Sequence, residues 1–310
     1  MGIFRRRRSG PSAPQPSDRP DQVFGRLSVD DVAWIRGLAQ RTLGENGVEA
    51  NVDEAGADLI GSDGMRFALD NVMTTCASVP RSDWPQIVTH HFAAMARTTG
   101  APSVRDLGRD ELFQRVRTRL LPVDALHMNG LDLATHSRPV AADLAAVLCV
   151  DFPETVSYFD STVAEGLPID ELFRAGQINT DAEPIEEIGT SDDGVLTFVA
   201  GSVYTASKTL SMANLVDRVF GRDMPHGVVF AVPDRNCVLL HPVESIDVLG
   251  AISHIAGTAE RIFTDAAWSV SPNVYHWYRD TITRISTVDD DRLTIVPTEE
   301  LVEILGRLAG

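Results

Sequence analysis

Tyr204 and Lys208 stand four residues apart in the pentapeptide Tyr-Thr-Ala-Ser-Lys, and Lys208 is the only lysine of the 310-residue chain. Residues with this spacing share one face of a helix. An ammonium group beside a phenol lowers the pKa of the phenol, so such a pair can pass a proton to or from a substrate. The pair is therefore the first candidate for catalysis.

The same pattern is typical of short-chain dehydrogenases, and Ser191 precedes Tyr204 by a suggestive thirteen residues. That fold needs a strand that runs into a glycine-rich turn, because backbone N–H groups there hold the pyrophosphate of the nucleotide. The cluster Gly56 to Gly64 does not match this fingerprint, and residues 1–60 show no βαβ pattern. A nicotinamide-dependent oxidoreductase that uses Tyr204, Lys208 and Ser191 is thus the alternative. We expect Lys208 to be a surface charge on an amphipathic helix.

Four further residues are candidates for binding, and they flank one predicted β-hairpin. His226 and His241 lie near its base, where two imidazoles could share a metal ion. No third ligand is identifiable nearby, so we expect hydrogen-bonded structural histidines and no metal. Asp234 and Arg235 lie at its tip, where turn chemistry explains them and a recognition tip is the functional alternative.

Charge is distributed unevenly along the chain. The formal net charge of the chain is −17. Residues 1–20 carry a net charge of +4, so the remaining 290 residues carry −21. A body this acidic repels phosphate backbones, so we do not expect the folded part to bind nucleic acid. The run Arg5, Arg6, Arg7 and Arg8 is expected to be solvated, with weak contact to an anionic lipid surface or to nucleic acid as the alternative.

The cysteines indicate the compartment. Cys76, Cys149 and Cys237 form no Cys-x-x-Cys pair, and their odd number gives no disulfide framework. We expect buried small apolar side chains in a soluble protein of the reducing cytoplasm. No segment approaches the roughly 20 apolar residues of a membrane span. The arginine run lacks a following apolar segment, so export is not expected.

The elements that position these residues are mixed in type. Residues 1–27 are rich in Arg, Pro and Ser and are expected to be a disordered basic tail. In the first half, the pattern predicts a helix from Ser28, short strands within 47–70, a helix from Ser82, and a helix over 106–119 with its arginines outward.

The second half has clearer signals. The apolar run 145–152 is expected to pair with 155–159, and helices are expected over 168–178, 202–220 and 245–266. Further strands are expected at 185–188, 194–200, 274–277 and 293–296, and a last helix from Thr298. Gly221 is expected to end the helix over 202–220.

The strongest local signal is the hairpin itself. Two apolar strands, 227–232 and 237–241, flank Pro233-Asp-Arg-Asn236, which suits a four-residue loop. If Val232 opposes Cys237, then Phe230 opposes Leu239. Both faces of both strands are apolar, so the hairpin is predicted to be central in its sheet and covered on each side.

These elements predict an α+β fold with a mixed or mostly antiparallel sheet and a central hairpin, about residues 227–241, packed by helices. Pro139 marks an expected seam. We therefore expect a basic tail (1–27), an N-terminal α+β sub-domain (28–138) and a C-terminal α+β sub-domain (139–310).

Several motifs of residues 165–245 occur in a familiar order. They are Ala175-x-x-x-Asn179, the strand from Gly194, Tyr204-Thr-Ala-Ser-Lys-x-Leu210, and the strand from Val228 that ends in Ala-Val-Pro233. This order resembles the YtpQ-like family of uncharacterised bacterial proteins, a domain of unknown function. The resemblance implies a soluble cytoplasmic bacterial protein and implies no reaction. It also makes the Tyr204–Lys208 segment part of a helix motif that need not hold a nicotinamide.

The functional expectation follows from these residues together. The sequence contains no convergent set of nucleophile, base and oxyanion donors, and no set of metal ligands. We expect a non-catalytic binding protein, a regulatory or accessory partner of another protein, with no cofactor.

Overall fold

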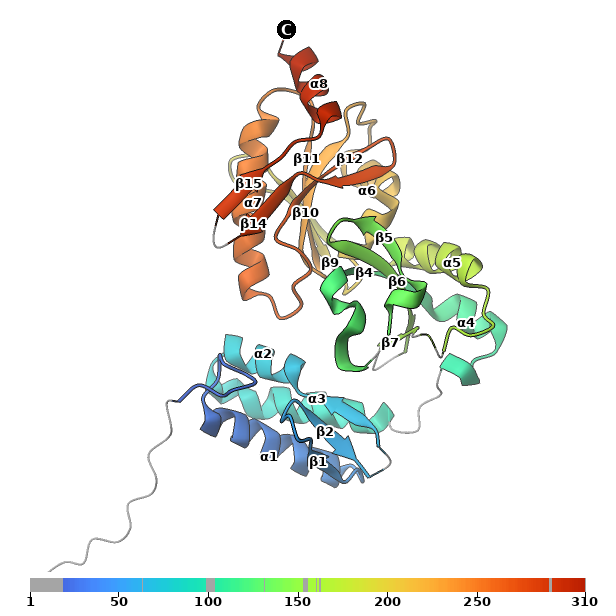
Figure 1. Cartoon of the computed structure of the whole chain (residues 1–310), viewed down its shortest axis with the longest axis vertical. Coiled ribbons are helices and arrows are strands. Elements are labelled where there is room, and N and C mark those ends of the chain that lie inside the picture. The colour runs from blue at the N-terminus through green and yellow to red at the C-terminus, as the bar shows by residue number, and fades with distance from the viewer. Residues whose placement is uncertain are drawn as a thin grey trace, which may run out of the picture. The chain divides into compact units, whose positions relative to one another are not determined.

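The computed structural model describes residues 19–309 except 63, 99–103, 131, 153–155, 160, 162, 290 and 291. It divides into two compact units, Met1–Thr99 and Gly100–Gly310 (Figure 1). The arginine run Arg5–Arg8 lies outside the described residues. Within them, no helix combines the length and the apolar character needed to cross a bilayer.

The N-terminal unit packs three helices against a small antiparallel sheet with the strand order β1-β2-β3. Ser28 caps the first helix as predicted, since its side chain accepts a hydrogen bond from the Asp31 amide. One core unites the buried faces of these elements, with Ile35, Phe67 and Phe92 among its largest members. The elements are α1 (Val29–Glu45), β1 (Ala50–Val52), β2 (Asp58–Gly61), β3 (Arg66–Ala68), α2 (Asp70–Ser78) and α3 (Trp84–Thr98).

The disordered tail expected over residues 1–27 includes nine residues, 19–27, that are ordered in the structure. Residues 19–27 lie against the N-terminal unit: Pro20 bridges to Ser28, and Leu27 is buried in the core beside Phe24. The Asp21 carboxylate also accepts hydrogen bonds from the amides of Val23 and Phe24. Two apolar side chains and one aspartate turn are enough to order this segment.

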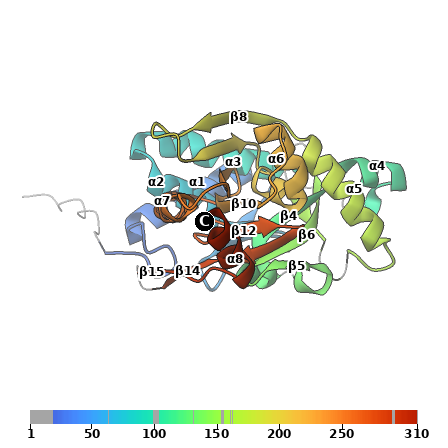
Figure 2. The same cartoon turned by 90° about the horizontal axis from the view of Figure 1, so that it is seen from above.

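The C-terminal unit is built on a six-stranded sheet with the order β13-β12-β10-β11-β9-β8, and each neighbouring pair is antiparallel. This confirms the α+β prediction. Figure 2 shows β8 on one side of the unit and the small hairpin β14–β15 on the other. The strands are β8 (Ile185–Thr190), β9 (Thr197–Gly201), β10 (Val228–Asp234), β11 (Cys237–Pro242), β12 (Val274–Tyr278), β13 (Thr281–Arg284), β14 (Ser286–Asp289) and β15 (Arg292–Ile295).

The predicted hairpin is β10–β11, and it is central and covered on both faces as expected. One face, with Val229 and Ala231, packs against α7 (Val248–Asp265) and α8 (Glu299–Leu308). The other, with Val228 and Phe230, packs against α6 (Met212–Phe220) and a second sheet. In Figure 1, α7 and α6 lie on opposite sides of β10 and β11.

The expected register of this hairpin was wrong by one residue. Phe230 pairs with Leu240 and not with Leu239, and Val229, not Val228, pairs with His241. A β-bulge between Ala231 and Asp234 absorbs one residue, so the pairing closes at Asp234 and Cys237 and the loop shortens to Arg235 and Asn236.

The second sheet has the order β4-β6-β5, with β7 also paired to β6. Its strands are β4 (Val116–Pro122), β5 (Arg138–Ala141), β6 (Leu144–Asp151) and β7 (Val156–Tyr158). The predicted pairing of the 145–152 run with 155–159 is confirmed. The helices α4 (Arg109–Arg115) and α5 (Ile169–Ala182) pack beside this sheet.

Two expectations fail at this sheet. The helix expected over 106–119 ends at Arg115, because Val116–Pro122 forms β4 and pairs along its whole length with β6. That pairing also crosses the sub-domain boundary expected between residues 138 and 139. The division lies instead at Thr99–Gly100, since a sheet cannot be cut between hydrogen-bonded strands.

Candidate functional site

Lys208 lies in a short 3-10 helix, Ala206–Ser211, and it is not the surface charge that we expected. Only 2 % of the residue is exposed. Its ammonium group donates to three backbone carbonyls at the C-terminal end of α5: Thr180 (2.8 Å), Asp181 (3.1 Å) and Glu183 (2.7 Å). Burial lowers the pKa of Lys208. The lysine therefore supplies donors to the carbonyls at the helix end, where, among the described residues, only Thr180 O also accepts a backbone hydrogen bond, from the Glu183 amide.

Tyr204 is buried at the start of the same loop, and its phenol does not engage Lys208. The hydroxyl donates to Asp151 Oδ1 at 2.8 Å. Burial and the neighbouring Cys149 raise the pKa of Tyr204. The shift is opposite to the lowered phenol pKa that proton transfer in a dehydrogenase requires.

Ser191 lies in the turn between β8 and β9, where its hydroxyl donates to Asp193 and accepts from the Leu196 amide. Ser191, Tyr204 and Lys208 thus each have separate structural partners. The sheet that carries them is antiparallel, whereas dinucleotides bind at the switch point of a parallel sheet. The geometry gives the oxidoreductase alternative no support.

The four binding candidates are divided between the two ends of the hairpin. His241 and His226 lie at its base: the His241 ring shares a 2.6 Å hydrogen bond with the Val195 carbonyl, and the His226 carbonyl bonds to the His276 ring at 3.0 Å. Asp234 and Arg235 lie at the other end, about 20 Å away along β10. Among the described residues, no group of three His, Cys, Asp or Glu side chains could hold a metal ion.

The hairpin tip does not project into solvent, because two other segments of the chain pack against it. The Arg235 amide donates to the Trp268 carbonyl, and the Arg235 carbonyl accepts from the Ala206 amide. Asn236 exchanges hydrogen bonds with Gly201 through both its carbonyl and its side chain. The tip therefore anchors the loop that carries Tyr204.

The Arg235 side chain stacks on an aromatic ring. Its guanidinium carbon lies 3.8 Å from the centroid of Trp268, and its only side-chain hydrogen bond within the described residues is a long one from Nε to Asn236 at 3.3 Å. Burial and the positive charge of Arg119 lower the pKa of Arg235 to about 10. Arg119 thus lies close enough to act on the charge of Arg235.

Arg119 comes from the middle of β4 and is 6 % exposed. Its guanidinium carbon lies 5.8 Å from the ring centroid of Tyr158 and 5.7 Å from that of Tyr204. Among the described residues it has no hydrogen-bond acceptor and no carboxylate within 4 Å. The Arg119 nitrogens do not belong to the completely buried side-chain nitrogen and oxygen atoms that lack a hydrogen-bond partner. They therefore keep a little contact with solvent.

We call this group the arginine cluster, and its five members come from five separate segments. They are Arg119 from β4, Tyr158 from β7, Tyr204 from the loop after β9, Arg235 from the hairpin tip and Trp268 from the segment before β12. Asp151 and Cys149 border it through Tyr204. Cations stacked on ring faces are held without using their N–H donors. The cluster therefore offers unused donors to an anion.

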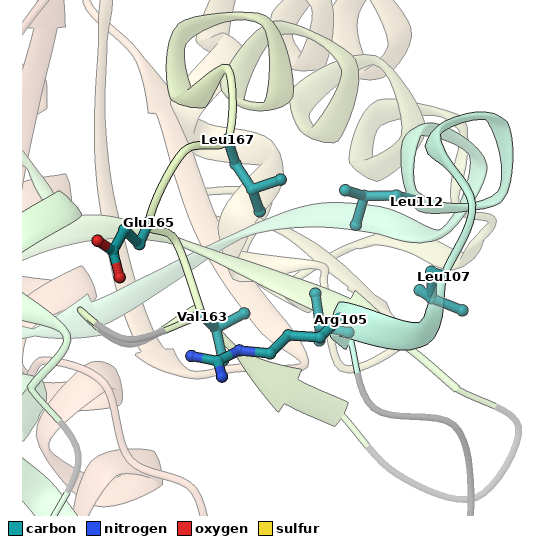
Figure 3. Close-up of a pocket in the computed structure, with 7 residues that line it drawn as sticks. Arg105, Leu107, Leu112, Val163, Glu165 and Leu167 are labelled. Atoms are coloured by element: carbon teal, nitrogen blue, oxygen red, sulfur yellow. The ribbon is translucent and has the colours of Figure 1, made fainter.

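Two cavities lie away from the arginine cluster. One of about 340 Å³ in the C-terminal unit is surrounded by apolar side chains from α4, the turn before it and the loop before α5, with Arg105 and Glu165 at its edge (Figure 3). Another, of about 260 Å³, lies in the N-terminal unit beside α2 and residues 23–27. Neither brings reactive groups together within the described residues.

The cysteines do not supply a nucleophile. Cys76 and Cys149 are buried, and burial raises the thiol pKa of Cys76 to about 11 and that of Cys149 to about 12. Cys237, half-buried, has a pKa raised by burial to about 11. Thiols with raised pKa values carry little thiolate at neutral pH.

Sequence reasoning selected Arg235 and Tyr204 but missed Arg119, Tyr158 and Trp268. Arg119 was placed on the outer face of a helix, and a strand assignment of Val116–Pro122 would have placed it opposite the apolar run of β6. An arginine inside an apolar strand was the available signal.

Comparisons of this chain with family models, with curated proteins and with solved structures gave no match. The resemblance to the YtpQ-like family therefore stays a prediction.

Proposed function

We propose that this protein is a non-catalytic binding protein that holds an anionic group of its ligand at the arginine cluster. The observation that carries the proposal is the Arg119 guanidinium, which is 6 % exposed and has no acceptor among the described residues. An arginine stays charged at every physiological pH. Burying a charge without a partner costs several kcal/mol, so an acceptor supplied from outside would be bound favourably.

The convergence of segments supports the same function. Five segments far apart in sequence supply the cluster, and both arginines lie beside aromatic rings. Donors that are already ordered lose little entropy on binding. A regulatory or accessory protein that recognises an acidic partner would use such a site.

The test compares the wild-type protein with Arg119→Met, because methionine keeps an apolar stem between the two tyrosine rings. Thermal unfolding is measured in sodium acetate, phosphate and sulfate at constant ionic strength, with chloride as the reference. We expect at least one anion to stabilise the wild type by about 2 kcal/mol at saturating concentration and to lose this effect in the variant.

Arg115→Gln is the matched control, since Arg115 is only four residues away in the sequence but already pairs with Glu111 at 2.9 Å. In chloride, we expect Arg119→Met to be as stable as the wild type or more stable, because it removes an unpaired buried charge. Anion effects that are the same in wild type and Arg119→Met, or a clear loss of stability of Arg119→Met in chloride, would refute the proposal.

A further inference from the structure

The arginine cluster also limits the chemistry of the anion that it can take. The Arg235 guanidinium carbon lies 3.8 Å from the Trp268 ring centroid, and the Arg119 guanidinium carbon lies 5.8 Å and 5.7 Å from the centroids of Tyr158 and Tyr204. A ring that lies against a face of a guanidinium leaves its edge open. That edge carries parallel N–H donors whose spacing matches the two oxygens of a carboxylate.

Local charge argues in the same direction. The Asp234 carboxylate acts on the charge of Arg235, and the Asp151 carboxylate accepts from Tyr204, whose ring centroid lies 5.7 Å from the guanidinium carbon of Arg119. Neither carboxylate forms an ion pair within 4 Å with Arg119 or Arg235 among the described residues. Asp151 is held by the Tyr204 hydroxyl, and Asp234 by the Asn236 amide at 2.7 Å. Two positive and two negative groups give a neutral surrounding, which accepts one added negative charge at less cost than two.

The rest of the molecule adds to this preference. The full chain carries a net charge of −17. A phosphate monoester brings a charge of about −1.5 to −2 at neutral pH, whereas a carboxylate brings −1. Long-range repulsion therefore disfavours the phosphate more than the carboxylate.

Access restricts the shape of the ligand. Arg119 is only 6 % exposed. A small group at the end of a molecule can enter such a narrow opening. A phosphodiester inside a polymer is flanked by bulky groups on both sides and cannot.

We propose that the ligand of the arginine cluster presents one terminal carboxylate, shared between Arg119 and Arg235. This inference rests on the proposed anion-binding function. The shared chemistry is the carboxylate, and it could come from a small organic acid or from the C-terminus of a peptide.

The experiment uses the full chain and three small probes: acetate, methyl phosphate and the neutral acetamide. Titration calorimetry at constant ionic strength gives the Kd of each. A four-atom ligand with two charge-assisted contacts is expected to bind with a Kd of about 1 mM. We expect acetate to bind at least tenfold more tightly than methyl phosphate, and acetamide not to bind.

Variants connect the affinity to the cluster. Arg119→Met and Arg235→Gln are each expected to weaken acetate binding at least tenfold, while Arg115→Gln leaves it unchanged. Folding of each variant is checked by its circular dichroism and by its unfolding midpoint in chloride. Should Arg235→Gln fail to fold, Arg119→Met alone carries the comparison.

Two further probes separate the sources of the carboxylate. Trialanine with a free C-terminus is compared with trialanine amide and with acetate. Binding of the free peptide at least tenfold more tightly than acetate assigns the site to a peptide terminus, and equal or weaker binding assigns it to a small acid. Either result supports the carboxylate.

The opposing results are distinct. Tighter binding of methyl phosphate than of acetate, lost in Arg119→Met, overturns the carboxylate and leaves the anion site in place. Absence of binding by acetate, methyl phosphate, phosphate and sulfate alike overturns both the carboxylate and the proposed function.

Discussion

At the scale of single residues, the pentapeptide from Tyr204 to Lys208 shows how far local spacing can mislead. The two side chains point to different partners, the Asp151 carboxylate and the carbonyls at the end of α5. Spacing predicts which residues share a face of a helix, but this segment is a turn followed by a 3-10 helix. The partners come from residues 28 and 53 positions away, which no local pattern contains.

The role of Lys208 predicts a large effect on stability. Lys208→Met removes one donor from each of three carbonyls. Thr180 O keeps the Glu183 amide and Asp181 O keeps Arg218, so Glu183 O is the one left without another donor among the described residues. An unpaired buried polar group costs about 1–3 kcal/mol, so we expect the free energy of unfolding to fall by about 2 kcal/mol in urea titrations. Arg218→Met is the control, because the exposed Arg218 also donates to Asp181 O at the same helix end but should cost less than about 1 kcal/mol. Equal costs for both variants would contradict this role.

His276 predicts a dependence of stability on pH. Its side chain is buried, and burial lowers the pKa of His276 below the ordinary value of 6.5. As the pH falls through about 6.5, the unfolded chain binds a proton at this position more readily than the folded one. Stability is therefore full above that pH and decreases below it.

The measurement is the free energy of unfolding at pH 7.5 and at pH 5.5. We expect the loss of stability over this interval to be smaller in His276→Gln than in the wild type. An unaltered pH dependence in His276→Gln would falsify this account.

At the scale of elements, the turn between β5 and β6 fastens the second sheet to the six-stranded one. Asp143 in this turn accepts hydrogen bonds at Oδ2 from Ser271 (2.9 Å), Asn273 (2.8 Å) and Tyr275 (2.6 Å). Arg284 from β13 lies 3.7 Å from its other oxygen. Burial and the charge of Asp143 raise the pKa of Tyr275, so the phenol remains a donor.

These hydrogen bonds predict that Asp143→Ala lowers the free energy of unfolding by about 3 kcal/mol, because three donors lose a charged acceptor. Asp223→Ala, at an exposed position, should change it by less than about 0.5 kcal/mol. Urea unfolding followed by far-ultraviolet circular dichroism measures both. A cost for Asp143→Ala as small as that of the control would show that the turn does not hold the sheets together.

The hairpin and the helices also show what local patterns predict well. The apolar faces of β10 and β11, the cap of α1 at Ser28 and the end of α6 at Gly221, which has a φ of 62°, agreed with expectation. Each depends on residues within a few positions of one another. The hairpin register failed because a bulge beside Pro233 depends on what packs against the strand end.

At the scale of the whole molecule, the two units have separate cores. Phe92 is fully buried in the core of the N-terminal unit, and Phe230 in a core of the C-terminal unit. Separate cores predict separate unfolding transitions in scanning calorimetry. Phe92→Leu is expected to lower the midpoint of one transition by about 5 °C, for a loss of about 1 kcal/mol, and to leave the other in place.

Phe230→Leu provides the reciprocal comparison, since it should lower only the other midpoint. A single transition that shifts in both variants would show that the units unfold together.

The sequence by itself determined the class of the fold, the central hairpin with two covered faces, the acidic charge, the start of α1 and the end of α6. These depend on composition and on contacts between near neighbours in the chain. The tertiary structure alone decided that Val116–Pro122 is a strand, that Lys208 is buried, and that Arg119 meets Arg235 among aromatic rings. Strand pairing joins residues from distant segments, and its energy depends on the packing of both partners, which no single segment specifies.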